Sequence, residues 1–201
     1  MAGPYYIEEM KDNKDTEHEG KTFEKIQGQE KVVSGRKFTE CIFKHCQLNG
    51  LVFEDCQFTD CVFEDCDLSL LAVKRSFFHK TQILRSKAIG INWYEARSIM
   101  ALQFTDTMLS YSSFFGKALK KMKFKNCVAK EVDFSDCVLT EADFGGTDLE
   151  GARFSGCDLS LANFREARNY SIDVLNNKVK KAKFSLPEAL ALLDSFDVVV
   201  E

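Results

Sequence analysis

The chain has 201 residues, of which 45% are hydrophobic and 29% charged, and its formal net charge is -4 at pH 7. This length and composition predict a single domain with a core of its own. The acidic balance argues against nucleic acid as a direct ligand, and no apolar run approaches the roughly 20 residues that a membrane span needs.

Residues 1–20 form a polar segment with six acidic side chains. The segment has neither the basic start nor the apolar stretch of a secretory signal, so we expect a cytoplasmic protein. Because it offers little apolar surface to bury, we predict that residues 1–20 are disordered or loosely attached.

Residues 21–168 carry an apolar residue at every fifth position, a period that belongs to neither the helix nor the strand. Such a period marks a repeat architecture in which successive coils stack on one another. The central positions of the two clearest runs are Phe38, Phe43, Leu48, Phe53, Phe58, Phe63, Leu68, Val73, Phe78, Ile83, Ala88 and Trp93, and then Phe104, Leu109, Phe114, Leu119, Phe124, Ala129, Phe134, Leu139, Phe144, Leu149, Phe154, Leu159 and Phe164.

Two residues before each central position lies a second column, made mostly of small or apolar side chains, and all eight cysteines occupy it. One large and one small inward side chain per pentad can fill a narrow tube, so we predict that both columns face inward. Metal sites favour shorter cysteine spacings with histidine partners, and disulfides are rare in the cytosol. We therefore interpret the cysteines as buried free thiols that pack like small hydrophobic side chains.

Two irregularities interrupt the repeat. The step from Trp93 to Phe104 is eleven residues where two pentads need ten, so one extra residue within 94–103 is expected to bulge or break the coil. Lys117 places a charge in the inward column, and a buried unpaired lysine is costly. We expect this pentad to distort outward, with contact to an anion or a partner as the alternative.

Residues 169–201 are predicted to cap the solenoid with a short α-helix, since an uncapped last coil would expose a strand edge. Ser185 and Glu188 have the spacing of a capping box, and Pro187 lies in the first turn. We predict that the apolar stripe of this helix is a homodimer interface, with a lid over the last coil as the alternative. The stripe consists of Leu186, Leu190, Leu193 and Phe196.

The pentads of residues 142–166 read AlaAspPheGlyGly, ThrAspLeuGluGly, AlaArgPheSerGly, CysAspLeuSerLeu and AlaAsnPheArgGlu. They resemble the pentapeptide-repeat family, whose pattern is a small residue, Asp or Asn, Leu or Phe, and two variable residues. The resemblance implies an all-β solenoid, a right-handed quadrilateral parallel β-helix in which four pentads make one coil of about 20 residues. Residues 20 apart, such as Phe58 and Phe78 or Cys41 and Cys61, would then stack.

No chemistry-bearing motif accompanies the repeat. The sequence has no nucleophile elbow, zinc-protease motif or phosphate-binding glycine loop. The paired carboxylates recur with the pentad and project outward, where nothing would raise the pKa of one of them for acid–base work. We predict a non-enzymatic protein-interaction or structural module with no catalytic residue, cofactor or metal.

Function is then expected on the outer faces, which carry regularly spaced acids. The resemblance supplies an alternative function, because the quinolone-resistance branch of the family is thought to mimic DNA and bind DNA gyrase or topoisomerase IV. The C-terminal tail resembles that of this branch, whose members dimerise through their C-terminal ends. The candidate partner-binding carboxylates are Glu54, Asp55, Glu64, Asp65, Glu131, Asp133, Asp136, Glu141, Asp143, Asp148 and Glu150.

Overall fold

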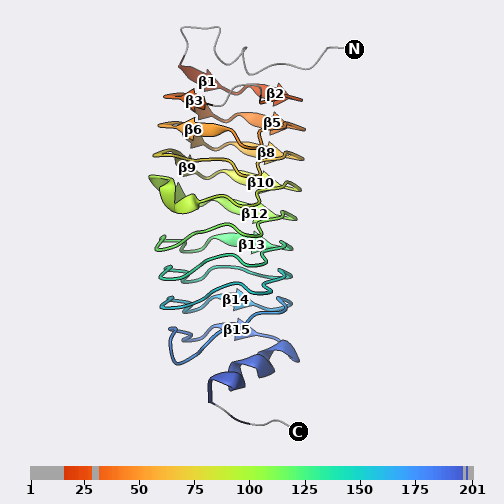
Figure 1. Ribbon diagram of the computed structural model, residues 1–201, viewed down its shortest axis with the longest axis vertical. Coiled ribbons are helices and arrows are strands. Elements are labelled where there is room, and N and C mark those ends of the chain that lie inside the picture. The colour runs from red at the N-terminus through yellow and green to blue at the C-terminus, as the bar shows by residue number, and fades with distance from the viewer. Residues whose placement is uncertain (1–15, 29–31, 197, 199–201) are drawn as a thin grey trace.

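A computed structural model describes residues 16–28, 32–196 and 198 of the chain. These residues form a parallel β-solenoid whose coils stack along one long axis, with a short helix at the C-terminal end (Figure 1). The quadrilateral β-helix predicted from the repeat is confirmed. Disorder was predicted for residues 1–20. Residues 1–15 lie outside the described residues, and the prediction was wrong for Glu17–Glu19, which form a strand paired with the next coil.

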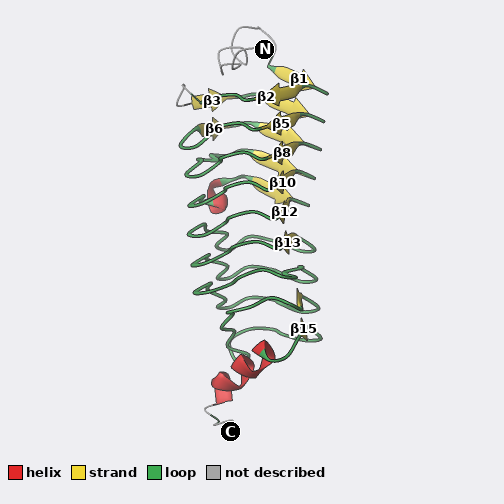
Figure 2. Cartoon of the chain, turned by 90° about the vertical axis from the view of Figure 1, so that its right-hand side faces the viewer, coloured by secondary structure: helices red, strands yellow, loops and turns green. Residues whose placement is uncertain are grey.

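Short strands lie at the same place in successive coils, and loops turn the corners between them (Figure 2). In the described residues the elements are β1 (Glu17–Glu19), β2 (Thr22–Glu24), β3 (Val32–Ser34), β4 (Lys37–Thr39), β5 (Ile42–Lys44), β6 (Val52–Glu54), β7 (Gln57–Thr59), β8 (Val62–Glu64), β9 (Phe77–His79), β10 (Gln82–Leu84), the 3-10 helix η1 (Trp93–Glu95), β11 (Ser98–Met100), β12 (Gln103–Thr105), β13 (Lys123–Lys125), β14 (Asn163–Phe164), β15 (Lys183–Phe184) and the 3-10 helix η2 (Glu188–Phe196).

Parallel pairing defines four faces. The first face holds the sheet β1-β4-β7-β9-β11, and the second holds β2-β5-β8-β10-β12-β13 and then β14-β15. On the third face, isolated β-bridges link one coil to the next in a series that begins at Gln27 and ends at Arg168. On the fourth face, β3 pairs with β6, and isolated bridges continue the series as far as Arg153. Most coils therefore hydrogen-bond to the next one on all four faces, which satisfies the backbone without a second layer.

The central residues fill the tube as stacks of rings. Phe58 is fully buried and lies between Phe38 and Phe78, with ring centroids 4.9 and 4.8 Å apart. Phe144 is placed in the same way between Phe124 and Phe164, at 5.0 and 4.9 Å. The predicted inward direction of the central column is thus confirmed, and the core is one continuous ladder of hydrophobic side chains.

The solenoid begins four residues earlier than the boundary expected at residue 21. β1 pairs with β4 in register, which puts His18 opposite Phe38. The imidazole is buried and stacks on the Phe38 ring at 5.0 Å, so it takes a central position. Because histidine is not an apolar residue, the apolar period did not predict this first strand.

The solenoid also extends past the boundary expected at residue 168. β15 pairs with β14, which stacks Phe184 on Phe164 at 5.2 Å, and Lys178 bridges to Asp158. Beyond this coil lies the expected C-terminal helix, which is a 3-10 helix rather than an α-helix. The Ser185 hydroxyl accepts a hydrogen bond from the Glu166 amide at 2.9 Å, so this side chain ties the last turn to the coil before it.

The extra residue in the repeat lies at η1. On the first face, the paired residues of β7 and β9 are 20 positions apart in the sequence, as in Phe58 and Phe78. The paired residues of β9 and β11 are 21 positions apart, as in Phe78 and Ile99. After β11 the first-face ladder stops: among the described residues no bridge or backbone hydrogen bond joins β11 to the next coil. It resumes in the following coil with the bridge from Ala118 to Val138.

Candidate functional site

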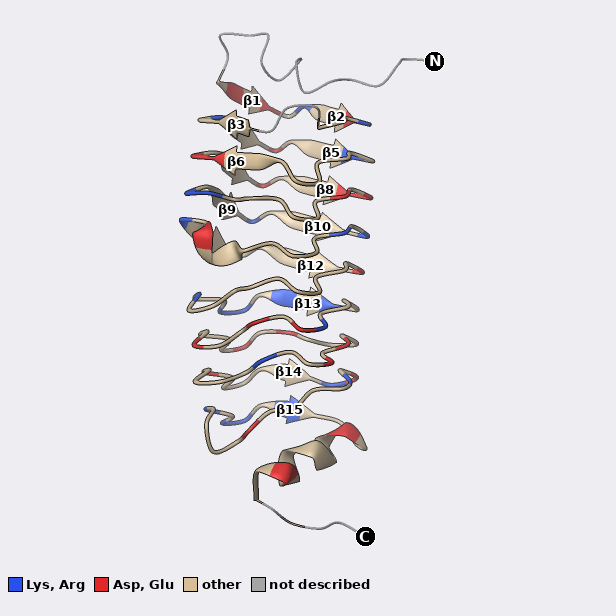
Figure 3. Cartoon of the chain, viewed as in Figure 1, with Lys and Arg blue, Asp and Glu red and all other residues tan. Residues whose placement is uncertain are grey.

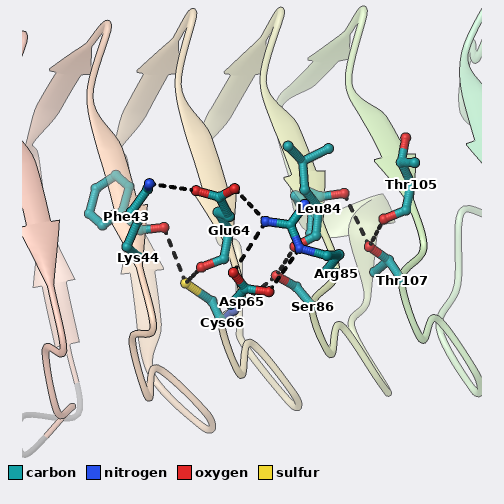
Figure 4. A network of polar contacts seen from close by, with 11 residues as sticks. Phe43, Lys44, Glu64, Asp65, Cys66, Leu84, Arg85, Ser86, Thr105 and Thr107 are labelled. Carbon is teal, nitrogen blue, oxygen red and sulfur yellow. Dashed lines mark hydrogen bonds and ion pairs between the residues drawn. The ribbon is translucent and has the colours of Figure 1, made fainter.

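The eight cysteines are free and buried in the inward column, as predicted. They also form hydrogen bonds that the interpretation as small hydrophobic side chains did not include. The Cys66 thiol donates to the carbonyls of Phe43 and Glu64, both at 3.3 Å (Figure 4), and the Ser76 hydroxyl in the same column donates to Phe53 and Lys74. Cysteine, serine and threonine can all occupy this column because each is small and has one S–H or O–H to donate to the corner carbonyls.

Thiol reactivity tests this placement. Burial raises the pKa of Cys127 and of Cys137 to about 12, which disfavours the reactive thiolate. We expect an aromatic disulfide reagent to modify none of the eight cysteines of the native protein and all eight after denaturation. Rapid modification of even one thiol in the native state would contradict the assignment of that cysteine to the interior.

In the described residues the interior of the tube is filled by the packed side chains of the core. In the part of the chain that the structure describes, no cluster of three or more His, Cys, Asp or Glu could hold a metal ion. The hollows found among the described residues are open surface grooves, such as the one lined by Asp143, Asn163 and Arg165. Over the same residues, no helix has the length and apolar character to span a bilayer.

The candidate carboxylates are spread over all four faces rather than gathered on one. Figure 3 shows acidic and basic residues interspersed along the solenoid. By the ladder positions, the fourth face holds Glu54, Asp55, Asp133 and Asp136, the second holds Glu64, Asp65 and Asp143, the third holds Glu131, Asp148 and Glu150, and the first holds Glu141.

Basic side chains one coil away neutralise most of these acids. Arg85 bridges Glu64 and Asp65, and Lys44 contacts Glu64 from the other side at 2.9 Å (Figure 4). The hydrogen bonds from Lys44 and Arg85 hold the pKa of Glu64 below its ordinary value. Glu131 and Asp136 are the candidates that form no ion pair with a described residue, and the others pair as in Arg75–Asp55, Lys121–Glu141, Lys125–Asp143, Lys130–Glu150 and Arg153–Asp133.

One candidate carboxylate is largely buried. Asp148 is 7% exposed, and its Oδ1 accepts hydrogen bonds from the Asn169 side chain at 2.8 Å and the Glu150 amide at 3.3 Å. Asp143 likewise accepts from the Gly145 amide at 3.1 Å and from Asn163 at 2.7 Å. The Asp that recurs before the central residue therefore builds the coil corner, and its place in the proposed acidic surface was wrong for Asp148.

The pentad of Lys117 departs from the regular coil, because it does not pair with β11, and the half-buried lysine has a partner within the protein. Its Nζ donates to the Ala96 carbonyl at 2.6 Å, across the gap in the first-face ladder after β11. Burial lowers the pKa of this lysine. The extra residue at η1 and the inward lysine, which look like two unrelated irregularities in the sequence, are thus one structural unit.

Replacing Lys117 with methionine is expected to lower the free energy of unfolding by about 1–2 kcal/mol, because it leaves the Ala96 carbonyl without a partner. Lys121→Met is the matched control, since its side chain is 66% exposed and pairs only with Glu141 at the surface. We expect the control to stay within about 0.5 kcal/mol of wild type in urea unfolding. Equal effects of the two substitutions would argue against a bridging role for Lys117.

The residues predicted to form a dimer interface lie together on η2 and the turn before it. Leu186, Leu190, Leu193 and Phe196 are 77, 45, 36 and 54% exposed. Leu192 instead packs against the core, and the Ser195 hydroxyl accepts from the Val174 amide at 3.1 Å. η2 therefore covers part of the last coil with one side and presents leucine and phenylalanine side chains on the other.

A second exposed apolar surface was not predicted from the sequence, because its members occupy variable positions of the pentad. Leu70 and Tyr111 lie at corners, with φ of 58° and 63°, where glycine, asparagine and aspartate are favoured. The Asn92–Ser113 bridge sets Tyr94 beside Phe115 one coil on. This apolar cluster spans the third and fourth faces over successive coils, and its members are Leu70, Tyr94, Met108, Tyr111 and Phe115, exposed by 68, 49, 41, 69 and 50%.

Several solved protein structures are similar to this chain. A trypsin-treated variant of QnrB1, a plasmid-mediated fluoroquinolone resistance protein, is 23% identical, covers 92% of this chain and 89% of its own, and gives a TM-score of 0.54. Full-length QnrB1 is 20% identical with 90% of each chain covered and a TM-score of 0.51. HetL, a pentapeptide repeat protein involved in heterocyst differentiation regulation from Nostoc sp. strain PCC 7120, is 15% identical over 83% of this chain and 81% of its own, with a TM-score of 0.38.

The QnrB1 structures share the fold at this level of identity. No curated protein sequence matches the chain. The family description "Pentapeptide repeat region" matches residues 36–114, and "Pentapeptide repeats (8 copies)" matches residues 123–156 and 146–168. Together with the stacked phenylalanine columns and the four-faced coil, these matches show that the chain belongs to the pentapeptide-repeat family.

Proposed function

We propose that this protein is a non-enzymatic interaction module that binds another protein with its outer faces. The apolar cluster is the observation that carries this proposal. Outward positions elsewhere in the solenoid are mostly charged or polar, whereas here five large apolar side chains are held in water by a rigid scaffold. Exposed apolar surface of this kind is typical of protein-binding sites.

A more specific candidate is a type II topoisomerase, bound where DNA normally lies. The likeness in fold to QnrB1 and the exposed carboxylates support this candidate. The ion pairs weaken it, because Arg75, Arg85 and Arg153 neutralise carboxylates that a DNA mimic would present. A cytoplasmic location and a homodimer joined by η2 belong to the same proposal.

Titration of the protein into a bacterial gyrase supercoiling assay, with and without a fluoroquinolone, tests this candidate. The expected result is inhibition of supercoiling, or relief of drug-stabilised cleavage, at micromolar protein. Two variants then separate the surfaces. DNA mimicry requires the effect to be lost in Glu131→Lys/Asp136→Lys, whereas docking through the apolar cluster requires its loss in Tyr111→Ser/Phe115→Ser. No effect of the wild-type protein would remove gyrase as the partner.

The wider proposal has its own test, which does not depend on gyrase. Host-cell extract is passed over the immobilised protein and over Tyr111→Ser/Phe115→Ser. The matched control is Val138→Ser/Leu161→Ser, which removes two residues that are each 43% exposed outside the cluster. A protein retained by wild type and control but lost by the cluster variant is the expected result. Equal retention by all three would contradict docking through the cluster.

A further inference from the structure

Within the described residues, the last coil ends in an open strand edge on the first face. In the coil before it, the amides of Leu159 and Leu161 donate to the carbonyls of Lys178 and Lys180 at 2.8 and 2.9 Å. The amides at the equivalent positions of the last coil, Val179 and Lys181, have no acceptor among the described residues. Two donors at the spacing of a parallel ladder are thus left for one more strand.

η2 covers a different part of this end. Its hydrogen bond from the Val174 amide and the groove that it forms with residues 171–173 lie on the fourth-face side. In the described chain no hydrogen bond joins η2 to residues 179–181. A whole second solenoid stacked on this end would meet η2, so the open edge suits a single extended segment.

The edge is also strongly basic. Residues 165–184 contain six basic and two acidic side chains, a formal charge of +4, and because the whole chain carries -4, the remainder carries -8. Lys178, Lys180, Lys181 and Lys183 are exposed, and none of them forms a salt bridge within the part of the chain that the structure describes. Lys178 and Lys180 flank the half-buried Val179, so their side chains lie on the outer side of the edge.

The opposite end of the solenoid shows how such an edge is recognised. There β1 presents Glu17 and Glu19 on either side of the inward His18 and pairs with β4 on the same face. Glu17 contacts the Lys37 ammonium at 2.7 Å. A strand with acidic side chains on both sides of an inward residue therefore already pairs with a lysine-bearing edge in this molecule.

We infer that the first-face edge of the last coil binds an extended segment of a partner protein in which two carboxylate side chains flank one apolar residue. The carboxylates lie opposite Lys178 and Lys180, and the apolar side chain covers Val179. The backbone adds one strand to the solenoid, with the Val179 and Lys181 amides as donors and the Asn177 carbonyl as acceptor. Main-chain bonds of this kind supply affinity, and the lysines supply selectivity for acidic segments.

Lysines beside an open edge also have a purely protective use, since they discourage unwanted strand pairing. Peptide binding distinguishes the two uses. The probe is a fluorescein-labelled Thr-Glu-Val-Glu-Thr peptide, and its binding to the full-length protein is followed by anisotropy at low salt. Two control peptides are expected to bind at least about tenfold more weakly. One is Thr-Lys-Val-Lys-Thr, and the other is the acidic peptide with its first Glu N-methylated, which removes the N–H that faces Asn177.

Protein variants locate the site. Lys178→Glu/Lys180→Glu is expected to weaken binding of the acidic peptide at least about tenfold. Lys120→Glu/Lys121→Glu makes the same change in charge on the first face, three coils away, and is expected to leave binding unchanged. Circular dichroism checks that both variants are folded.

Three results would overturn the inference. No binding of the acidic peptide would mean that the lysines only protect the edge. Equal losses in the two double variants would mean that net charge, and not this edge, attracts the peptide. Undiminished binding of the N-methylated peptide, or equally tight binding of a DNA duplex, would mean that the coil attracts polyanions without strand addition. None of these results depends on whether gyrase is a partner.

Discussion

Phe58→Asp is expected to abolish cooperative folding of the solenoid. Phe58 is fully buried, stacks between Phe38 and Phe78, and meets Phe53 edge-on at 4.9 Å. Truncating such a ring costs about 3–5 kcal/mol, and an unpaired buried carboxylate adds several more. The sum is comparable with the roughly 5–15 kcal/mol that stabilises a whole domain. Thermal unfolding followed by far-ultraviolet circular dichroism measures the effect.

Phe115→Asp is the matched control for this substitution. Phe115 follows the central residue Phe114 and is 50% exposed, so the same chemical change occurs at an outward position. We expect its free energy of unfolding to stay within about 0.5 kcal/mol of wild type. Phe58→Leu, which nearly keeps the volume, is expected to cost less than about 1.5 kcal/mol. A soluble Phe58→Asp protein with a native spectrum and a cooperative transition would refute the inward assignment.

Leu190→Glu is expected to convert a homodimer into a monomer. The substitution puts a carboxylate at the middle of the exposed apolar row on η2, between Leu186 and Leu193. Burying that charge against a second copy without a partner costs more than a small apolar interface supplies. Size-exclusion chromatography with light scattering is expected to show the mass falling from twice 22.9 kDa to 22.9 kDa.

Leu161→Glu is the control for the loss of an exposed leucine. Leu161 is 43% exposed at a solenoid corner, against 45% for Leu190, and we expect its variant to keep the dimer mass. A wild-type protein with the mass of one chain would refute the dimer. A dimeric Leu190→Glu protein would mean that η2 serves only as a lid and that the dimer forms elsewhere.

Sequence reasoning located most of the core because the tube imposes the same chemistry at every fifth residue. A phenylalanine such as Phe124 stacks on the residue 20 positions away, Phe144, so the period itself encodes the contact. The first strand, β1, was missed for the corresponding reason: His18 occupies a central position without being apolar. The last coil was missed because Asn169, with φ of 58°, stands where the apolar period requires a central residue.

The candidate surface was predictable only in part. The pentad phase shows that Glu64 and Arg85 both point outward, but they are 21 residues apart and meet only because one coil separates them. Asp148 was placed on the surface because Asp is polar, whereas its carboxylate is used to hold a corner. The apolar cluster was overlooked because Leu70 and Tyr111 are at positions that the repeat leaves free.

The sequence by itself determined which side chains line the tube, since burial of apolar surface selects two residues in every five and the period repeats that choice along the chain. Only the tertiary structure decided which side chains of successive coils contact one another. The Lys117 bond to Ala96, the ion pairs that neutralise the acidic faces and the open edge at Lys178–Lys181 all join or expose positions about 20 residues apart. Such contacts depend on where one extra residue shifts the ladder and on which end has no next coil.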